Sequence, residues 1–359
     1  DFKRLVEKFP ESGIRVVLDG VFNHVGRRFF AFEDVCARRE GSDKIDWFHI
    51  NFGGNTAYND GFWYEGWEGH MELVKLNLHC GAVTDYIRRA VEFWIDEFGI
   101  DGLRLDVSYL LPEWFFEFLR RIVRAKRDDF FLMGEVIHIQ NFAKNLTPDR
   151  LDSITNYECY KGLTSALNSA NFFEIEHSLT RLFGREQWCL YTGKHLFNFA
   201  DNHDVIRACT AIADKRKLAA LYTILYCMPG IPCVYYGSEC GAEGDKSDGD
   251  YKLRPFIGDI DKNKAPELSA LIKKLNGIRR GSRALAYGGY EKCVLNNKYL
   301  CFKREADGER IYCAVNISDA DVTVRVEEAE GEDFITGEVR NLNDIYLPPF
   351  AVRIYKRRG

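Results

Sequence analysis

The fold is decided by four short stretches of the chain: VVLDGVFNH (residues 16–24), GLRLDV (102–107), FLMGEV (131–136) and FNFADNHD (197–204). Each is an apolar run that leads into a carboxylate. A carboxylate at the carboxyl end of a buried strand loses hydration free energy, and folds tolerate that loss mainly where the charge is used. We therefore expect Asp106, Glu135 and Asp204 to form one functional site.

The composition excludes several classes of partner. The net charge is −5, with both signs interspersed, so the chain offers no basic face for nucleic acid. No apolar run approaches the roughly 20 residues that span a bilayer, and we expect no membrane partner. Eleven cysteines, scattered singly without a CxxC pair, argue against a disulfide framework and a zinc site. This pattern indicates a reducing, cytoplasmic location.

Segments with strand and helix patterns alternate over the first three quarters of the chain, which predicts an α/β fold with a parallel sheet. The predicted strands are 14–18, 102–107, 130–136, 151–156, 196–199 and 232–236. The predicted helices are 2–9, 83–98, 113–126, 160–183, 214–227 and 265–280. Residues 26–78 lack any periodicity that would support a core helix, and from about residue 284 short alternating strands predict an all-β domain.

The four stretches, in this order, resemble the signature regions of the α-amylase superfamily, glycoside hydrolase family 13. A fifth segment, ELVKLN at residues 72–77, is similar to the Pro-Lys-Leu-Asn stretch of the neopullulanase, cyclomaltodextrinase and oligo-1,6-glucosidase group, with Val74 where proline is usual. The resemblance favours an enzyme of small oligosaccharides over a secreted, starch-liquefying one.

The resemblance implies a catalytic (β/α)8 TIM barrel over residues 1–283, with a domain B at about 26–78 after the third strand. A C-terminal β-sandwich would occupy residues 284–359. The sequence supplies six barrel strands where such a barrel requires eight. We therefore expect the first two strands upstream of Asp1, in about 100 or more additional residues, or on another protomer. An oligomer is compatible with this expectation.

The resemblance also assigns the chemistry. Asp106 matches the nucleophile and Glu135 the general acid and base, which in a retaining enzyme lie about 5 to 5.5 Å apart. Asp204 matches the third carboxylate, which holds sugar hydroxyls and stabilises positive charge. Arg104 would hydrogen-bond Asp106 from the same strand face and keep it ionised, while Asp19 would orient Arg104.

Six further residues match substrate-binding positions: His24, Trp67, Lys75, His138, Asn202 and His203. Asn23 matches a calcium ligand in some relatives and a brace for domain B in others, and a single Asn does not decide between them. No other metal or cofactor is implied. The aromatic residues Trp63, Tyr64 and Trp67 either stack on sugar rings or form the small core of domain B.

Two departures from the family pattern bear on function. Asp106 is followed by Val107-Ser108-Tyr109 instead of the Lys-His pair of true α-amylases, which disfavours endo-acting starch binding. Ser238 replaces the more usual Asp in the last barrel motif. The expected activity is hydrolysis of α-glucans or α-gluco-oligosaccharides through a covalent Asp106 intermediate. Transglycosylation or isomerisation, and a catalytically inactive binding module, remain alternatives.

Overall fold

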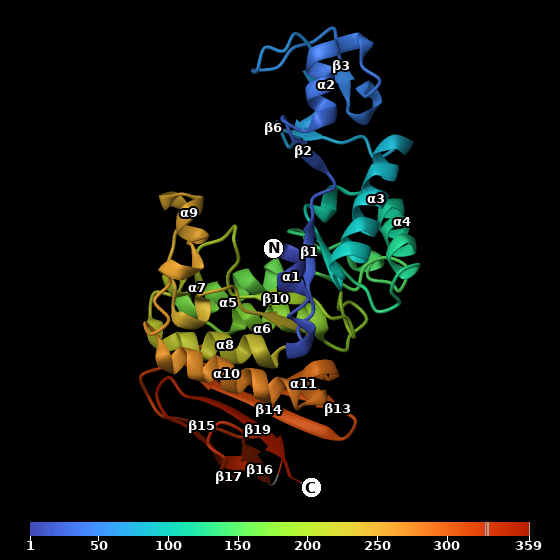
Figure 1. Cartoon of the computed structure of the whole chain (residues 1–359). Helices are drawn as coiled ribbons and strands as arrows, with labels where there is room; N and C mark the ends of the chain where they lie inside the picture. The colour runs from blue at the N-terminus through green and yellow to red at the C-terminus, as the bar shows by residue number, and fades with distance from the viewer. Residues whose placement is uncertain (327, 329, 359) are drawn as a thin grey trace. The chain divides into compact units, whose positions relative to one another are not determined.

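The computed structural model describes residues 1–326, 328 and 330–358, which divide into two compact units. The first unit contains residues 1–137 and 144–154, and the second contains 138–143 and 155–359. None of the helices among these residues combines the length and apolarity needed to cross a membrane. Figure 1 shows the chain coloured from its N-terminus to its C-terminus, with many of the helices and strands labelled.

The first unit is built on a four-stranded parallel sheet in the order β1-β7-β8-β9. The strands are β1 (Val17–Gly20), β7 (Gly102–Leu105), β8 (Phe131–Gly134) and β9 (Ser153–Ile154). The predicted range 14–18 for β1 starts three residues too early and ends two residues too early. The Val16 amide donates to the Asp101 carboxylate at 2.7 Å, and strand pairing starts one residue later, with Val17 opposite Gly102.

Two long helices of this unit pack against each other, α3 (Gly81–Phe98) and α4 (Glu113–Arg124) (Figure 1). Helix α3 buries four apolar side chains at a spacing of four residues: Val83, Ile87, Val91 and Ile95. It ends at Gly99, whose φ of 67° is the left-handed conformation that glycine adopts without steric cost. The predicted helix 2–9 is shorter, α1 (Phe2–Val6), because Pro10 begins a separate 3₁₀ turn.

The irregular stretch 26–78 contains a helix that the sequence analysis excluded, α2 (Phe30–Arg38). Its buried face is short, consisting of Ala31, Phe32 and Val35. Short strands accompany it: β2 (His24–Gly26), β5 (Gly66–Trp67) and β6 (His70–Lys75) in one sheet, and β3 (Ile50–Asn51) with β4 (Trp63–Tyr64) in another. The Arg27 guanidinium makes a bidentate ion pair with Asp60, 2.9 Å for each contact.

The second unit contributes two more parallel strands, β10 (Phe197–Phe199) and β11 (Ile231–Cys233), which pair with each other. Its helices include α5 (Tyr157–Ser169), α6 (Phe173–Phe183), α8 (Leu218–Cys227), α10 (Pro266–Arg280) and α11 (Arg283–Tyr287), and the short helices α7 (Ala208–Ala211) and α9 (Asp250–Leu253). The parallel strands of the described residues therefore number six, the count that the sequence predicts.

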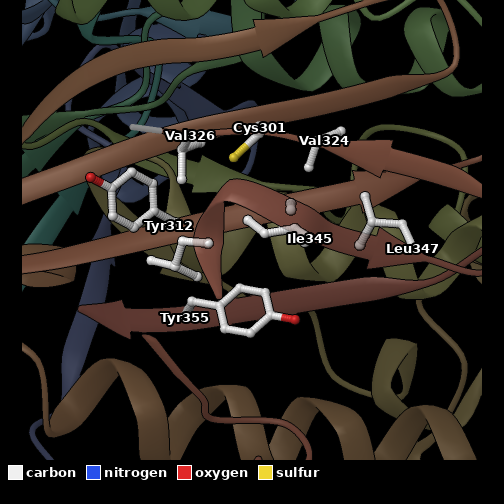
Figure 2. Packing of buried hydrophobic residues seen from close by; sticks show 9 residues of the cluster. Cys301, Tyr312, Val324, Val326, Ile345, Leu347 and Tyr355 are labelled. Atoms are coloured by element: carbon white, nitrogen blue, oxygen red, sulfur yellow. The ribbon is translucent and has the colours of Figure 1, made fainter. Parts of the chain in front are cut away.

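The C-terminal part of this unit forms a six-stranded antiparallel sheet in the order β12-β13-β14-β19-β16-β17. These strands are β12 (Gly289–Leu295), β13 (Tyr299–Ala306), β14 (Glu309–Asn316), β16 (Glu330–Asp333), β17 (Val339–Asn341) and β19 (Val352–Arg357). A separate pair, β15 (Val322–Val324) and β18 (Ile345–Leu347), packs its apolar side chains on the sheet (Figure 2). Helices α8 and α11 also contact this sheet, at β14.

Candidate active site

The carboxyl ends of β1, β7 and β8 bring one arginine and three carboxylates together. Arg104 Nη1 donates to Asp19 Oδ1 and Oδ2, at 2.6 and 2.7 Å, and to Asp106 Oδ1 at 3.3 Å. Arg104 Nη2 pairs with Glu135 Oε1 at 2.9 Å. The strand register explains the cluster, because Asp19 lies opposite Arg104 and residues two apart on a strand share a face.

Arg104 binds one carboxylate more than the sequence predicts. Its predicted contacts with Asp106 and Asp19 are present, and it also holds Glu135. A guanidinium has five N–H donors in a fixed plane, so it can serve several carboxylates at once. Because Asp106 and Glu135 share this guanidinium, they face the same space. The distance between their carboxyl groups stays a prediction.

Glu135 is buried, with 6% of its surface exposed, and its second oxygen is also held. Oε2 accepts a hydrogen bond from the Val107 backbone amide at 3.1 Å. Val107 has φ 39°, a left-handed conformation that is costly for a β-branched residue. The Ser108 amide donates to the Glu135 carbonyl at 2.9 Å, so the turn after β7 holds both ends of this residue.

Burial and the neighbouring Glu135 carboxylate raise the pKa of Asp106 to about 6, although Arg104 opposes the shift. Both effects disfavour a second negative charge in a partly desolvated site. A pKa in this range is far above that of an ordinary Asp. Asp106 therefore gains its charge only as the pH approaches neutrality.

A second group of predicted residues lies on β2 and β6, which pair with His24 opposite Lys75. Burial lowers the pKa of His24, so its ring is neutral near pH 7. Asn23 Nδ2 donates to His24 Nδ1 at 3.2 Å, which leaves the proton on Nε2. The Trp67 ring stacks on His24 at 5.6 Å between centroids, and Lys75 Nζ contacts Glu65 Oε1 at 2.5 Å.

Asn23 contacts the end of domain B and His24. Its carbonyl accepts a hydrogen bond from the Leu76 amide at 2.9 Å, which joins β2 to the end of domain B, and its side-chain amide is directed to His24. Calcium requires six to eight oxygen ligands. Among residues 1–326, 328 and 330–358, no group of three or more His, Cys, Asp or Glu side chains could hold a metal ion. The choice between a calcium ligand and a brace for Asn23 stays a prediction.

The aromatic residues of domain B were predicted either to stack on sugar rings or to form its core, and the structure differs from one side chain to the next. Tyr64 is fully buried and packs on Phe32, as the core alternative predicts. Trp63 is 39% exposed and lines a pocket together with Trp67. Trp63 is therefore accessible at the pocket, whereas the Trp67 ring stacks on both His24 and His70 and Tyr64 is buried.

The remaining predicted residues belong to the second unit. Asn202 shapes their loop, because its Oδ1 accepts from the amides of Asp204 and Val205, at 2.8 and 3.1 Å. His203 Nε2 lies 3.0 Å from Asp204 Oδ2, and Arg254 Nη2 lies 3.1 Å from Asp204 Oδ1. His138 is exposed. The meeting of Asp204 with Asp106 and Glu135 stays a prediction.

The sequence analysis did not identify the buried residues that hold the loop around Asn202 in place. Asp201 is 1% exposed, and its Oδ2 accepts from Ser238 Oγ at 2.7 Å and from the Ala208 amide at 2.8 Å. Arg207 is fully buried over the Tyr235 ring, 4.4 Å from its centroid. Ser238, singled out only as a departure from the family pattern, thus holds the residue that precedes Asn202. Asp201 itself stands in the quoted stretch FNFADNHD, directly after the residues FNFA, and that position was the available signal.

Comparison with known proteins assigns the family. The sequence matches the α-amylase catalytic domain over residues 1–283. The chain belongs to the α-amylase family. This match confirms the resemblance found in the sequence. The relatives of the chain include cyclomaltodextrinases and neopullulanases.

Three relatives illustrate the similarity. A cyclomaltodextrinase from Bacillus sp. is 33% identical over 340 residues, which cover 90% of this chain and 58% of the relative. Neopullulanase 2 from Thermoactinomyces vulgaris is 30% identical and is matched over 94% of this chain and 58% of the relative. A solved structure described as cyclomaltodextrinase superposes with a TM-score of 0.85 at 29% identity, covering 99% of this chain and 62% of that one. The chain thus spans about 60% of the length of these relatives.

Proposed function

We propose that this protein is a retaining α-glycosidase that acts on α-gluco-oligosaccharides. The observation that carries the proposal is the sharing of one guanidinium by Asp106 and Glu135 at adjacent strand ends. A retaining glycosidase needs two carboxyl groups side by side, one ionised and one protonated. The family and the names of the relatives support α-glucan substrates.

The proposed first step breaks the bond between the anomeric carbon and the glycosidic oxygen. The Asp106 carboxylate attacks the anomeric carbon and forms a glycosyl ester, while Glu135 gives its proton to the departing oxygen. In the second step Glu135 takes a proton from water, and the resulting hydroxide releases the sugar from Asp106. The configuration at the anomeric carbon is therefore retained.

The charge on Asp106 follows from its surroundings. Its pKa is raised to about 6 by burial and by the Glu135 carboxylate, so Asp106 is mostly ionised at pH 7 and above. The reaction uses the form with the proton on Glu135 and the charge on Asp106. Arg104 stabilises that charge, and Asp19 fixes the plane of the guanidinium through its two contacts.

Asp204 is the proposed third carboxylate, with His203 beside it as a sugar ligand. Their mutual contact and the Arg254 contact hold the Asp204 side chain in one orientation. The roles of His24, Trp67, Lys75, His138 and Asn202 in substrate binding belong to the same proposal. A cytoplasmic location is proposed on the distribution of the cysteines, all eleven of which are free thiols in the structure.

The test is incubation of the full-length gene product with maltotriose, cyclodextrin, pullulan and isomaltose, followed by chromatography and by NMR of the first anomer released. We expect α-configured products from at least one substrate. A 5-fluoro-α-glycosyl fluoride should label the tryptic peptide that contains Asp106, as seen by mass spectrometry. β-configured products, or a label on another carboxylate, would show that the proposed mechanism is wrong.

Transglycosylation is the second candidate, because an acceptor sugar can replace water in the second step. The same chromatography distinguishes hydrolysis from transglycosylation, since transfer produces oligosaccharides longer than the substrate. We expect the share of transfer products to rise with maltotriose concentration if sugar competes with water for the Asp106 ester.

A further inference from the structure

A bulge in the C-terminal sheet brings two cysteines to facing positions. Strands β12 and β13 pair with Lys292 opposite Phe302 and with Val294 opposite Cys301, and Cys293 is the extra residue between these pairs. At a bulge, two residues of one strand share one residue of the other. Facing residues of antiparallel strands have Cα atoms about 4.5 to 5.5 Å apart, and a disulfide spans about 4.4 to 6.8 Å. Cys293 and Cys301 therefore lie within the reach of a disulfide.

The two cysteines belong to the same apolar cluster but differ in exposure. Cys301 is fully buried, and its sulfur lies among side chains that include Val324 and Val326 (Figure 2). Cys293 is only partly buried and packs against this cluster. A reagent in solvent can therefore reach Cys293, whereas Cys301 is shielded from it.

The two thiols also differ in acidity. A hydrogen bond from Cys301 and the Lys303 ammonium lower the pKa of Cys293, although burial and the Glu291 carboxylate oppose the shift. The same hydrogen bond and burial raise the pKa of Cys301, so this thiol keeps its proton and donates it to the Cys293 sulfur. The thiolate is the attacking form in thiol–disulfide exchange. Cys293 is therefore the thiol that reacts first.

A second pair of neighbouring thiols provides a contrast within the same unit. Cys313, on β14, donates a hydrogen bond to Cys227, the last residue of α8, and both residues are fully buried. Burial raises the pKa of Cys313, and it shields both sulfurs from solvent. Proximity alone is thus common to the two pairs. Only Cys293 combines a neighbouring thiol with partial exposure and a lowered pKa.

We propose that Cys293 and Cys301 are a redox-active thiol pair, which a small disulfide such as oxidised glutathione converts into a disulfide bond within the β12–β13 hairpin. The Cys293 thiolate attacks one sulfur of oxidised glutathione, whose S–S bond breaks and releases one glutathione thiolate. Cys301 then gives up its proton and attacks the Cys293 sulfur, which releases the second glutathione. Two cysteines are oxidised, one small disulfide is reduced, and the two cysteine protons end on the two glutathione thiols.

The bond protects the core of the C-terminal sheet. Sulfinic and sulfonic acids form irreversibly when an oxidant attacks a thiol further, whereas a disulfide is reversed by other thiols. An acid group on Cys301 would place an unpaired charge among apolar side chains, which is costly. A reductant reopens the bond, in agreement with the free thiols of the structure. This role is independent of the proposed glycosidase activity and goes beyond it.

The test treats the reduced full-length gene product with oxidised glutathione. Trypsin cuts after lysines, which places Cys293 on the peptide 293–298 and Cys301 on the peptide 299–303. We expect mass spectrometry without reduction to show these two peptides joined by a disulfide, and dithiothreitol to separate them. In the reduced, folded protein, iodoacetamide should label Cys293 about tenfold faster than Cys301, or more.

Two variants control the assignment. Cys293→Ser should abolish the joined peptides and leave Cys301 as a thiol. Cys189→Ser, at another partly buried thiol, is the matched control and should leave the joining unchanged. The proposal is overturned if glutathione remains attached to Cys293 without transfer to Cys301, or if Cys293 does not react. It is also overturned if the buried pair of Cys227 and Cys313 joins equally fast in the folded protein.

Discussion

The end of strand β7 and the core of the C-terminal sheet use buried side chains in opposite ways. At β7, three carboxylates share Arg104, and the pKa of Asp106 is raised because its charge is poorly solvated. In the C-terminal core, Ile345 and Leu347 are fully buried among apolar neighbours (Figure 2). In the first region, buried carboxylates lose hydration free energy and depend on one arginine, whereas in the second, apolar packing contributes stability directly. Substitutions should therefore separate activity from folding.

The largest effect is expected for Asp106→Asn. Removing the proposed nucleophile should lower kcat on maltotriose by about a thousandfold or more, since triad-like groups act as a unit. The substitution preserves side-chain volume, so the melting temperature should stay close to that of the wild type. Steady-state kinetics and calorimetry measure the two effects. Asp129→Asn, at a half-exposed ion pair with Arg15, is the control and should retain full activity.

For Ile345→Ala we expect the opposite result, a loss of stability with unchanged activity. Removing a fully buried side chain from the core should lower the free energy of unfolding by about 2 to 5 kcal/mol. Urea unfolding measures the loss, and kcat per folded molecule should not change. The neighbour Tyr346 is 55% exposed, so Tyr346→Ala should cost less than about 1 kcal/mol. Equal losses at the two positions would contradict the packing described here.

The pH dependence of kcat/KM and of the free energy of unfolding tests the charged region around Asp106. Because Asp106 has a pKa of about 6, kcat/KM should fall about tenfold for each pH unit below 6 as the nucleophile is protonated. The unfolded chain gives Asp an ordinary pKa of about 3.9. The raised native pKa therefore contributes stability below pH 4, and this contribution is lost as the pH rises through 6.

Asp106→Asn should remove both dependences. Its free energy of unfolding should lack the component that decreases between pH 4 and 6, as measured by urea titration at several pH values. A wild-type acid limb near pH 4 instead of pH 6 would show that Asp106 is ionised more easily than its surroundings indicate.

The smallest effect is expected for Arg254→Met. This side chain pairs with Asp204 at 3.1 Å, but both partners are exposed by more than a third. Exposed ion pairs contribute about 0 to 1 kcal/mol, so the free energy of unfolding should change by less than that in urea titration. A loss above about 2 kcal/mol would mean that the loop around Asp204 carries more of the fold than its exposure suggests.

The sequence predicted what depends on local pattern. Carboxylates after apolar runs located the strand ends, and a spacing of two placed Arg104 and Asp106 on one face. It could not predict the Arg104–Glu135 pair or the Val107 contact to Glu135, because these depend on the register between strands and on one unusual φ value. Helix α2 was missed because its buried face is only three residues, too short for a periodic signal.

Val107 combines a strained backbone conformation with a buried side chain. A β-branched residue held at φ 39° costs on the order of 1 to 3 kcal/mol, which a glycine at this position would largely recover. Val107 is also only 5% exposed, so Val107→Gly would relieve the strained φ but would lose a buried side chain, and the two effects oppose each other. The looser turn would aim the amide at Glu135 less firmly and would free Leu110 and Tyr109 to move. Valine at this position therefore keeps the turn packed and holds its amide toward Glu135, at the cost of a strained φ.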